Sequence, residues 1–95
     1  MIRKLRAFHG SENVFRDLGR PNADVEQIKA ILATQIIIAL DARKLTVRAA
    51  QALTGTAAAD FSRIRRVKLD RFTIDRLVAI LNKLDRRVSV SVRRR

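Results

Sequence analysis

Two short helix-forming runs are joined by a turn in the middle of this 95-residue chain. The first run starts at Leu45-Thr46, with Thr46 as its N-cap, and ends near Leu53. The second run covers about residues 57–66. Gly55 stands between them, and a glycine adopts the positive φ angle of a tight turn at little cost. This order predicts a helix-turn-helix motif whose second helix presents one face outward.

Three more helices and one strand are expected around this motif. The helices are predicted at 13–19, at 23–43 with Asn22 as N-cap, and at 73–84 with Thr73 as N-cap. Residues 87–92 alternate between apolar and polar side chains, which predicts a strand. The expected fold class is therefore all-α, a bundle of about five helices with a C-terminal β-strand. Residues 1–12 are expected to be an N-terminal extension, and residues 13–95 a single domain.

The 23–43 helix is apolar on more than one side. Ile31 and Ile38 fall on a second side of it, and Ile37 on a third. A surface helix of a single domain is not apolar all round. Either this helix is central in the fold, or its second side meets another chain. Its main stripe, at spacings of three and four, is Val25, Ile28, Leu32, Ile36 and Leu40.

The predicted C-terminal strand carries its apolar side chains at Val88, Val90 and Val92. A lone strand leaves its backbone N–H and C=O groups without partners, and no second strand is evident in the sequence. We therefore expect these valines to pair with another chain, either a second copy or a different protein. The alternative is a strand that packs on its own helices and leaves one edge in water.

The formal charge of +12 is concentrated in the second half of the chain. Residues 1–43 hold 7 Lys and Arg against 5 Asp and Glu, and residues 44–95 hold 14 against 4. A basic field of this size attracts polyanions, chiefly nucleic acid. A merely soluble basic surface or ribosome association are the alternatives. Single-stranded RNA is less favoured, because the chain has only four aromatic residues, all Phe.

Several function classes lack their residues in this sequence. There is no cysteine, and His9 is the only histidine, so neither disulfides nor a transition-metal site are expected. No Gly-rich phosphate loop and no nucleophile–base arrangement is present, so we expect no enzyme and no cofactor. No apolar run reaches the length of about 18 residues that a membrane span needs, and no signal-peptide core follows the start. A cytoplasmic, nucleoid-associated protein is expected.

The helix at 57–66 has a distinct inner and outer face. Phe61 and Ile64 lie together with Ala57 on a helical wheel, and we expect these three to point into the core. The opposite face, at spacings of three, four and seven, is Ala59, Ser62, Arg63 and Arg66, with Ala58 and Arg65 beside it. A helix in the major groove of DNA presents such a face, with its N-terminal residues nearest the bases.

The side-chain chemistry suggests a role for each position. Arg63 can bind guanine O6 and N7 or a phosphate, and Arg65 could exchange roles with it. Asp60 can accept from cytosine N4 or hold a neighbouring arginine in place, and Ser62 can bond a base or a phosphate. The alanines could contact a thymine methyl, and a helix start such as that at Thr46 can bind a phosphate. The expected DNA-binding residues are Thr46, Arg48, Ala58, Ala59, Asp60, Ser62, Arg63, Arg65, Arg66 and Lys68, with Arg48, Arg66 and Lys68 as phosphate clamps.

Three segments of the chain resemble the Xre-type helix-turn-helix proteins, which have a lambda-repressor-like fold, and among them the HigA-type antitoxins. The first is Gly10-Ser-Glu-Asn-Val-Phe-Arg-Asp-Leu-Gly, and the second runs from Leu45-Thr through Thr54-Gly to Ala59-Asp-Phe-Ser-Arg-Ile-Arg. The third is the segment from Leu69 to Leu84, followed by the alternating strand. Together they cover residues 10–92.

This resemblance implies a helical bundle that forms a homodimer, binds double-stranded operator DNA and represses its own operon. It also implies a neighbouring toxin that cleaves messenger RNA. The chain departs from the family at Val47 and Ala57-Ala-Ala, where glutamines are usual, and at Gln51, where a small residue is usual. The family's base contacts are therefore not carried over. The alternatives are a module that mainly binds and neutralises a toxin, through Ile31, Ile38 and the terminal valines, and a nonspecific basic nucleic-acid-binding protein.

Overall fold

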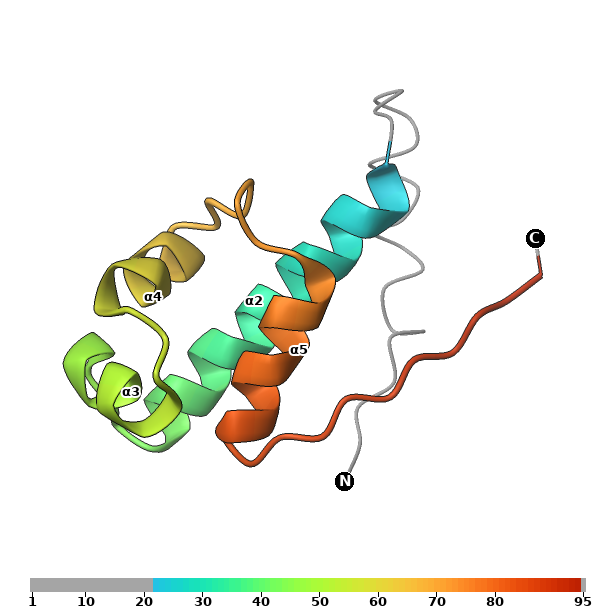
Figure 1. The fold of residues 1–95 in the computed structure, drawn as a ribbon. Coiled ribbons are helices and arrows are strands. Elements are labelled where there is room, and N and C mark those ends of the chain that lie inside the picture. Colours follow the sequence, from blue (N-terminus) through green and yellow to red (C-terminus); the bar gives the residue numbers. More distant parts are fainter. Residues whose placement is uncertain (1–21, 95) are drawn as a thin grey trace.

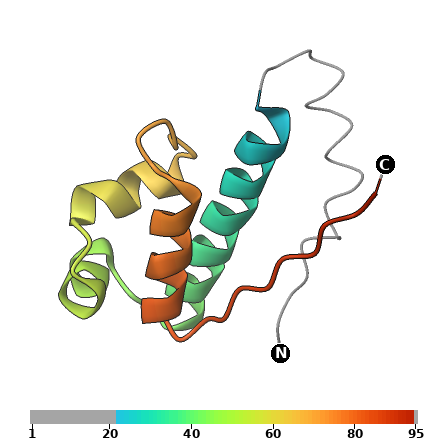
Figure 2. The same cartoon turned by 45° about the vertical axis from the view of Figure 1, so that its right-hand side comes forward.

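The computed structural model describes residues 22–94, which contain four helices and confirm the helix-turn-helix motif. The long helix α2 and the helix α5 lie side by side, and α3 and α4 form the motif at one end of this pair (Figures 1 and 2). The bounds are α2 Ala23–Ala42, α3 Val47–Thr54, α4 Ala58–Arg65 and α5 Ile74–Lys83. The helix expected at 13–19, and with it the boundary between extension and domain, lies outside the residues that the structure describes.

Two of the three expected N-caps are confirmed. The Thr46 hydroxyl accepts from the Ala49 N–H at 3.1 Å, and the Thr73 hydroxyl accepts from the Arg76 N–H at 3.2 Å. Asn22 stands at the N-cap position of α2 as predicted, but its side chain makes no cap hydrogen bond. Its φ of 62° is left-handed, whereas a capping side chain needs an extended backbone to reach back to the helix.

Gly55 makes the turn between α3 and α4, as the sequence predicts. Its φ is +78°, and its N–H donates to the Gln51 carbonyl at 2.8 Å. This left-handed residue ends α3 and lets the chain reverse direction within a few residues.

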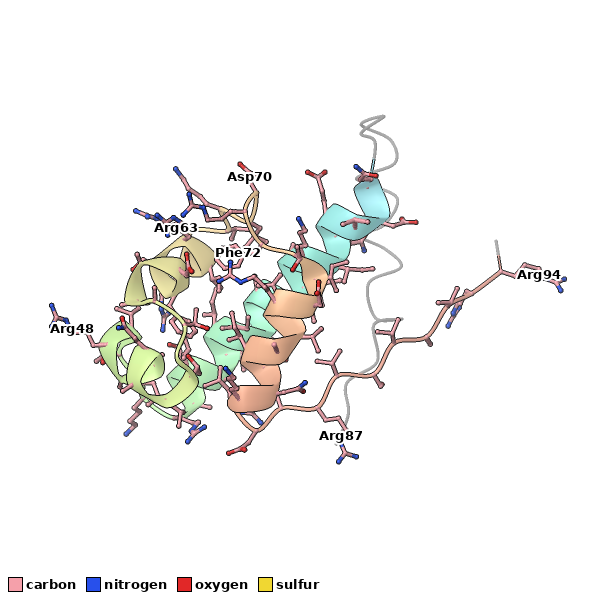
Figure 3. All side chains as sticks on the ribbon, in the orientation of Figure 1. Arg48, Arg63, Asp70, Phe72, Arg87 and Arg94 are labelled. Atoms are coloured by element: carbon pink, nitrogen blue, oxygen red, sulfur yellow. The ribbon has the colours of Figure 1, made fainter. Side chains whose placement is uncertain are left out.

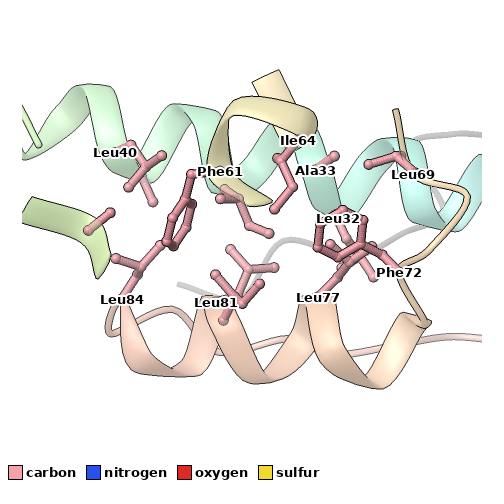
Figure 4. Packing of buried hydrophobic residues seen from close by; sticks show 14 residues of the cluster. Leu32, Ala33, Leu40, Phe61, Ile64, Leu69, Phe72, Leu77, Leu81 and Leu84 are labelled. Carbon is pink, nitrogen blue, oxygen red and sulfur yellow. The ribbon is translucent and has the colours of Figure 1, made fainter. Parts of the chain in front are cut away.

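The core of the domain lies between α2, α4 and α5 (Figure 4). Phe61 extends from α4 and is completely buried beside Leu40 of α2 and Leu84, the C-cap of α5. One aromatic ring thus fixes the helix-turn-helix motif to both long helices. The buried cluster is Leu32, Ala33, Ile36, Ala39, Leu40, Ala50, Phe61, Ile64, Leu69, Phe72, Leu77, Ile80, Leu81 and Leu84.

Helix α2 is central in the fold, and its apolar residues divide accordingly. The expected stripe is buried or half-buried except for Val25, which is 39% exposed because it lies in the first turn, where α2 extends past α5 (Figure 1). Ile37, on the expected third side, packs against the core, so the core reaches that side of α2 as well. Ile31 is buried at 8% exposure without belonging to the core cluster, and Ile38 is 47% exposed.

Residues 87–92 run as an extended segment away from the helices (Figure 2). Ser89 forms an isolated β-bridge, but within the described part of the chain residues 87–92 form no strand, and the strand stays a prediction. Val88 packs against the core, whereas Val90 is 62% and Val92 92% exposed. A strand is stable only when its backbone N–H and C=O groups pair with those of another strand. In residues 22–94, no helix is long and apolar enough to cross a membrane.

Three helices end in the same backbone arrangement, with a non-glycine residue in the left-handed region. After α4 this residue is Val67, with φ of 56°. Its N–H donates to the Ile64 carbonyl at 3.0 Å, and the next N–H, of Lys68, donates to the Arg63 carbonyl at 2.9 Å. This is a Schellman motif, which glycine usually completes. A β-branched residue is the most strained choice there.

We expect Val67→Gly to raise the free energy of unfolding by about 0.5–1 kcal/mol. Left-handed backbone costs an L-residue about 1–2 kcal/mol, and the greater freedom of glycine in the unfolded chain returns about 0.5–1 kcal/mol. Val67 is 56% exposed, so little packing is lost. Urea denaturation measures the change. Lys44→Gly, at the matching position after α2 with φ of 53°, should gain less because lysine is unbranched. An equal gain at both positions would contradict the role of β-branching.

Candidate nucleic-acid interface

The start of α4 is held by a side chain from α3. Ala57, at the cap position, makes no side-chain cap, and the Ala58 N–H instead donates to Gln51 Oε1 at 2.8 Å. Gln51 is therefore what ties the two helices of the motif together where a small residue is usual in the resembling family. The sequence offered one signal for this bond, a glutamine on the first helix followed by a second helix that lacks its own capping residue.

A second brace comes from α5. Lys83 Nζ donates to the Thr54 carbonyl at 2.9 Å, at the end of α3. The Thr54 hydroxyl donates to the Ala50 carbonyl at 2.7 Å and accepts from the Thr56 N–H at 3.1 Å. The turn is thus fixed by hydrogen bonds on both sides of Gly55, which sets the angle at which α4 is presented.

The two faces of α4 are arranged as the helical wheel predicts. Phe61 and Ile64 are fully buried, and the inward prediction for Ala57 is wrong because that residue precedes the helix and is exposed. On the outer face, some positions are open to solvent and others are partly covered by neighbouring side chains. The exposed ones are Ala59, Arg65 and Arg66, and the half-buried ones are Ala58, Asp60, Ser62 and Arg63.

Asp60 lies at the centre of an ion-pair cluster. Its Oδ1 accepts from Arg63 Nη1 at 2.8 Å, and its Oδ2 accepts from Arg76 Nη2 of α5 at 3.0 Å. The Arg76 guanidinium also lies 4.9 Å from the centre of the Phe72 ring. Burial raises the pKa of Asp60, but the hydrogen bonds and charges of Arg76 and Arg63 outweigh it, so the pKa lies below its ordinary value. Asp60 is therefore ionised at neutral pH.

Arg65 is also paired inside the protein. Its Nη2 lies 2.8 Å from Asp41 Oδ1 at the end of α2, with 36% and 63% of the two side chains exposed. An ion pair this open to water contributes little to stability and opens easily. Arg65 can therefore exchange Asp41 for a phosphate, whereas Arg63 is held by a carboxylate that is only 15% exposed.

Other basic residues near α4 make no ion pair with the described residues. Arg66 and Lys68 are exposed at the end of this helix, and Arg71 follows in the loop beside Asp70. Arg48 extends from the start of α3, on the same side of the molecule as Arg63 (Figure 3). The hydroxyl of Thr46, at the N-cap of this helix, accepts the cap hydrogen bond from the Ala49 N–H. Unpaired, exposed cations of this kind are free to bind phosphates.

Over residues 22–94, no three His, Cys, Asp or Glu side chains form a group that could hold a metal ion. Asp60 and Asp41 are instead paired with arginines.

A glycine turn, two buried anchors on the second helix and an exposed basic outer face define a helix-turn-helix domain of the DNA-binding class. Residues 14–93 match the model of a family described as a helix-turn-helix domain. The match covers most of the chain, and the protein belongs to this family. No curated protein and no solved structure matches the chain.

Proposed function

We propose that this protein is a sequence-specific transcriptional regulator that represses its own operon. The observation that carries the proposal is the outer face of α4, which presents three arginines at or near the solvent while Phe61 and Ile64 fix the opposite face in the core. A helix presented in this way fits the major groove. In the cell, such a protein would work in the cytoplasm at the nucleoid.

The contacts follow from the position of each side chain. Ala58, Ala59, Ser62 and Arg63 lie in the first two turns of α4, the part of a recognition helix that approaches the bases most closely. Small alanines permit close approach and contact with a thymine methyl. Around them, the phosphates would be bound by Arg48, Arg65, Arg66 and Lys68 and by the helix start after Thr46.

We further propose that the protein acts as a homodimer. A chain of 95 residues can bury only a modest core, and Ile38, Val90 and Val92 remain exposed. Two copies would place their α4 helices in successive major grooves, about 34–36 Å apart. A pseudo-palindromic operator with that spacing is expected.

Substitution of one expected base reader and one expected phosphate clamp tests the proposal. A duplex selected by the wild-type protein from a random library supplies the operator. Arg63→Ala should relax specificity at one base pair, because a guanine contact contributes about 1–3 kcal/mol of discrimination. Lys68→Ala should weaken all sequences alike, because a phosphate contact carries no sequence information. Fluorescence anisotropy on single-base-pair variants measures both effects.

The outcomes separate the functions under comparison. If both variants weaken every duplex equally, Arg63 is not a base reader. If the wild-type protein selects no sequence and ribosomal RNA competes equally at physiological salt, the protein is a nonspecific basic nucleic-acid-binding protein.

A second candidate function is the antitoxin role, in which the protein binds and neutralises a toxin. The observation that favours it is the extended C-terminal segment, whose Val90 and Val92 are largely exposed. An extended segment can add a strand to the sheet edge of a partner. A neighbouring reading frame of toxin size, and co-purification of its product with the full chain but not with a Val90→Ser/Val92→Ser variant, would support this role. Co-purification that is unchanged by the two substitutions would exclude this segment as the contact.

A further inference from the structure

We infer that Asp60 is a positioning residue that holds Arg63 for base reading, and that Arg76 of α5 anchors it. The inference rests on the proposed DNA-binding function and adds residues to its reading site. Arg76 lies outside the helix-turn-helix motif, 16 positions from Asp60 along the chain. Arg76 is not among the DNA-binding residues that the sequence predicts.

Both carboxylate oxygens of Asp60 are occupied inside the protein. Oδ1 lies 2.8 Å from Arg63 Nη1, and Oδ2 lies 3.0 Å from Arg76 Nη2. These charged hydrogen bonds are stronger than neutral ones and hold the carboxylate against the protein, although each oxygen keeps a second lone pair. Its side chain is also the less accessible, at 15% exposure against 34% for Arg63. The arginine is therefore the member of the pair that meets DNA.

The anchor of Asp60 does not depend on Arg63. The Arg76 guanidinium lies over the Phe72 ring, 4.9 Å from its centre, and Phe72 is 1% exposed in the core. Arg76 is also the residue whose N–H is bound by the Thr73 cap. A chain of contacts thus runs from the core through Phe72, Arg76 and Asp60 to Arg63. This chain holds the carboxylate in place, so Asp60 can keep one Arg63 donor while the other donors of Arg63 meet a base.

A held arginine discriminates better than a free one. One of its five N–H donors is bound to Asp60, and the others remain for guanine O6 and N7. Binding then costs less side-chain entropy, because the rotamer is already restricted. Without Asp60, Arg63 would be free to move to the nearest phosphate, which carries no sequence information.

The test compares a selected duplex with a shuffled duplex of the same composition, both bound by the full chain at fixed salt. For Asp60→Asn we expect the ratio of the two affinities to fall by about 10-fold, within the range of one base contact. Affinity for the shuffled duplex should rise severalfold, because a negative charge near the phosphates is lost. The two affinities thus change in opposite senses, which a general loss of folding would not produce.

Three further variants make the result specific. Asp70→Asn removes a carboxylate from the exposed loop after α4. It should raise the affinity for both duplexes by the same factor and leave the ratio of the two affinities unchanged. Arg76→Gln should lower the ratio of the two affinities although it changes neither Asp60 nor Arg63 themselves. In an Arg63→Ala background, Asp60→Asn should cause no further fall in the ratio, because its effect passes through Arg63.

Some results would overturn the inference. An additive loss in the double variant would make Asp60 a DNA contact in its own right, and an unchanged ratio in Asp60→Asn would remove its role altogether. A wild-type protein that binds both duplexes equally would instead overturn the proposed function, and the positioning role with it. Thermal unfolding of each variant in the absence of DNA identifies any change that comes from the fold.

Discussion

A Phe61→Ala variant is expected to lose about 3–5 kcal/mol of the free energy of unfolding, the usual cost of removing a buried aromatic ring. The ring is completely buried and extends from α4 to both long helices (Figure 4). A domain of this size has a total stability of only about 5–15 kcal/mol. The variant is therefore expected to unfold near room temperature or at low urea concentration, and to lose DNA binding as a consequence. Circular dichroism during urea titration measures the shift.

Leu53→Ala is the matched control for this loss. Leu53 is a large apolar residue of the same helix-turn-helix motif, but it is 45% exposed. Its truncation should change the stability by about 0.5 kcal/mol, as is usual at the surface. If Phe61→Ala unfolded at the same urea concentration as Leu53→Ala, α4 would not depend on this ring for its position, and the outer face of α4 would be less well defined than we argue.

The parts of the fold that follow from neighbouring residues could be predicted from the sequence. The caps at Thr46 and Thr73 and the turn at Gly55 depend on residues at most four positions away. The predictions for all three are confirmed. The inner face of α4 was also correct at Phe61 and Ile64, because helical periodicity alone separates two faces.

The parts that depend on how helices meet could not be predicted. Val25 continues the apolar stripe of α2, but it is exposed because α2 extends past α5. Periodicity shows which side of a helix is apolar and does not show how far a neighbour covers it.

The candidate site shows the same division. The sequence identified the basic face of α4 and left two roles open for Asp60. The structure shows that Asp60 pairs with Arg63. It adds two pairs between distant positions, Asp60–Arg76, 16 residues apart, and Asp41–Arg65, 24 residues apart. Ion pairs between distant positions follow no periodicity, and many combinations of 21 basic and 9 acidic residues would be equally plausible from the sequence. Only the packing of α4 against α2 and α5 selects among them.

The largest effect on DNA binding is expected from replacing Arg66, Lys68 and Arg71 together with glutamine. These three residues are exposed and make no ion pair with the rest of the described chain, so each is available for a phosphate. Each lost phosphate contact reduces the slope of log affinity against log salt by about 0.9. We expect the slope to fall by about 2–3 and the affinity at about 0.1 M salt to fall by about 100-fold or more. Anisotropy titrations over a range of salt concentrations measure both quantities.

The C-terminal segment offers a control that removes the same charge elsewhere. Arg87→Gln/Arg93→Gln/Arg94→Gln also lowers the net charge by three, but Arg87 and Arg94 lie on the other side of the molecule from Arg48 and Arg63 (Figure 3). If binding depends on a phosphate track beside α4, this variant should keep most of the salt dependence and most of the affinity. Equal losses in the two triple variants would mean that total charge governs binding rather than its placement. The protein would then bind nucleic acid as a basic polyelectrolyte, and the geometry of α4 would not determine where it binds.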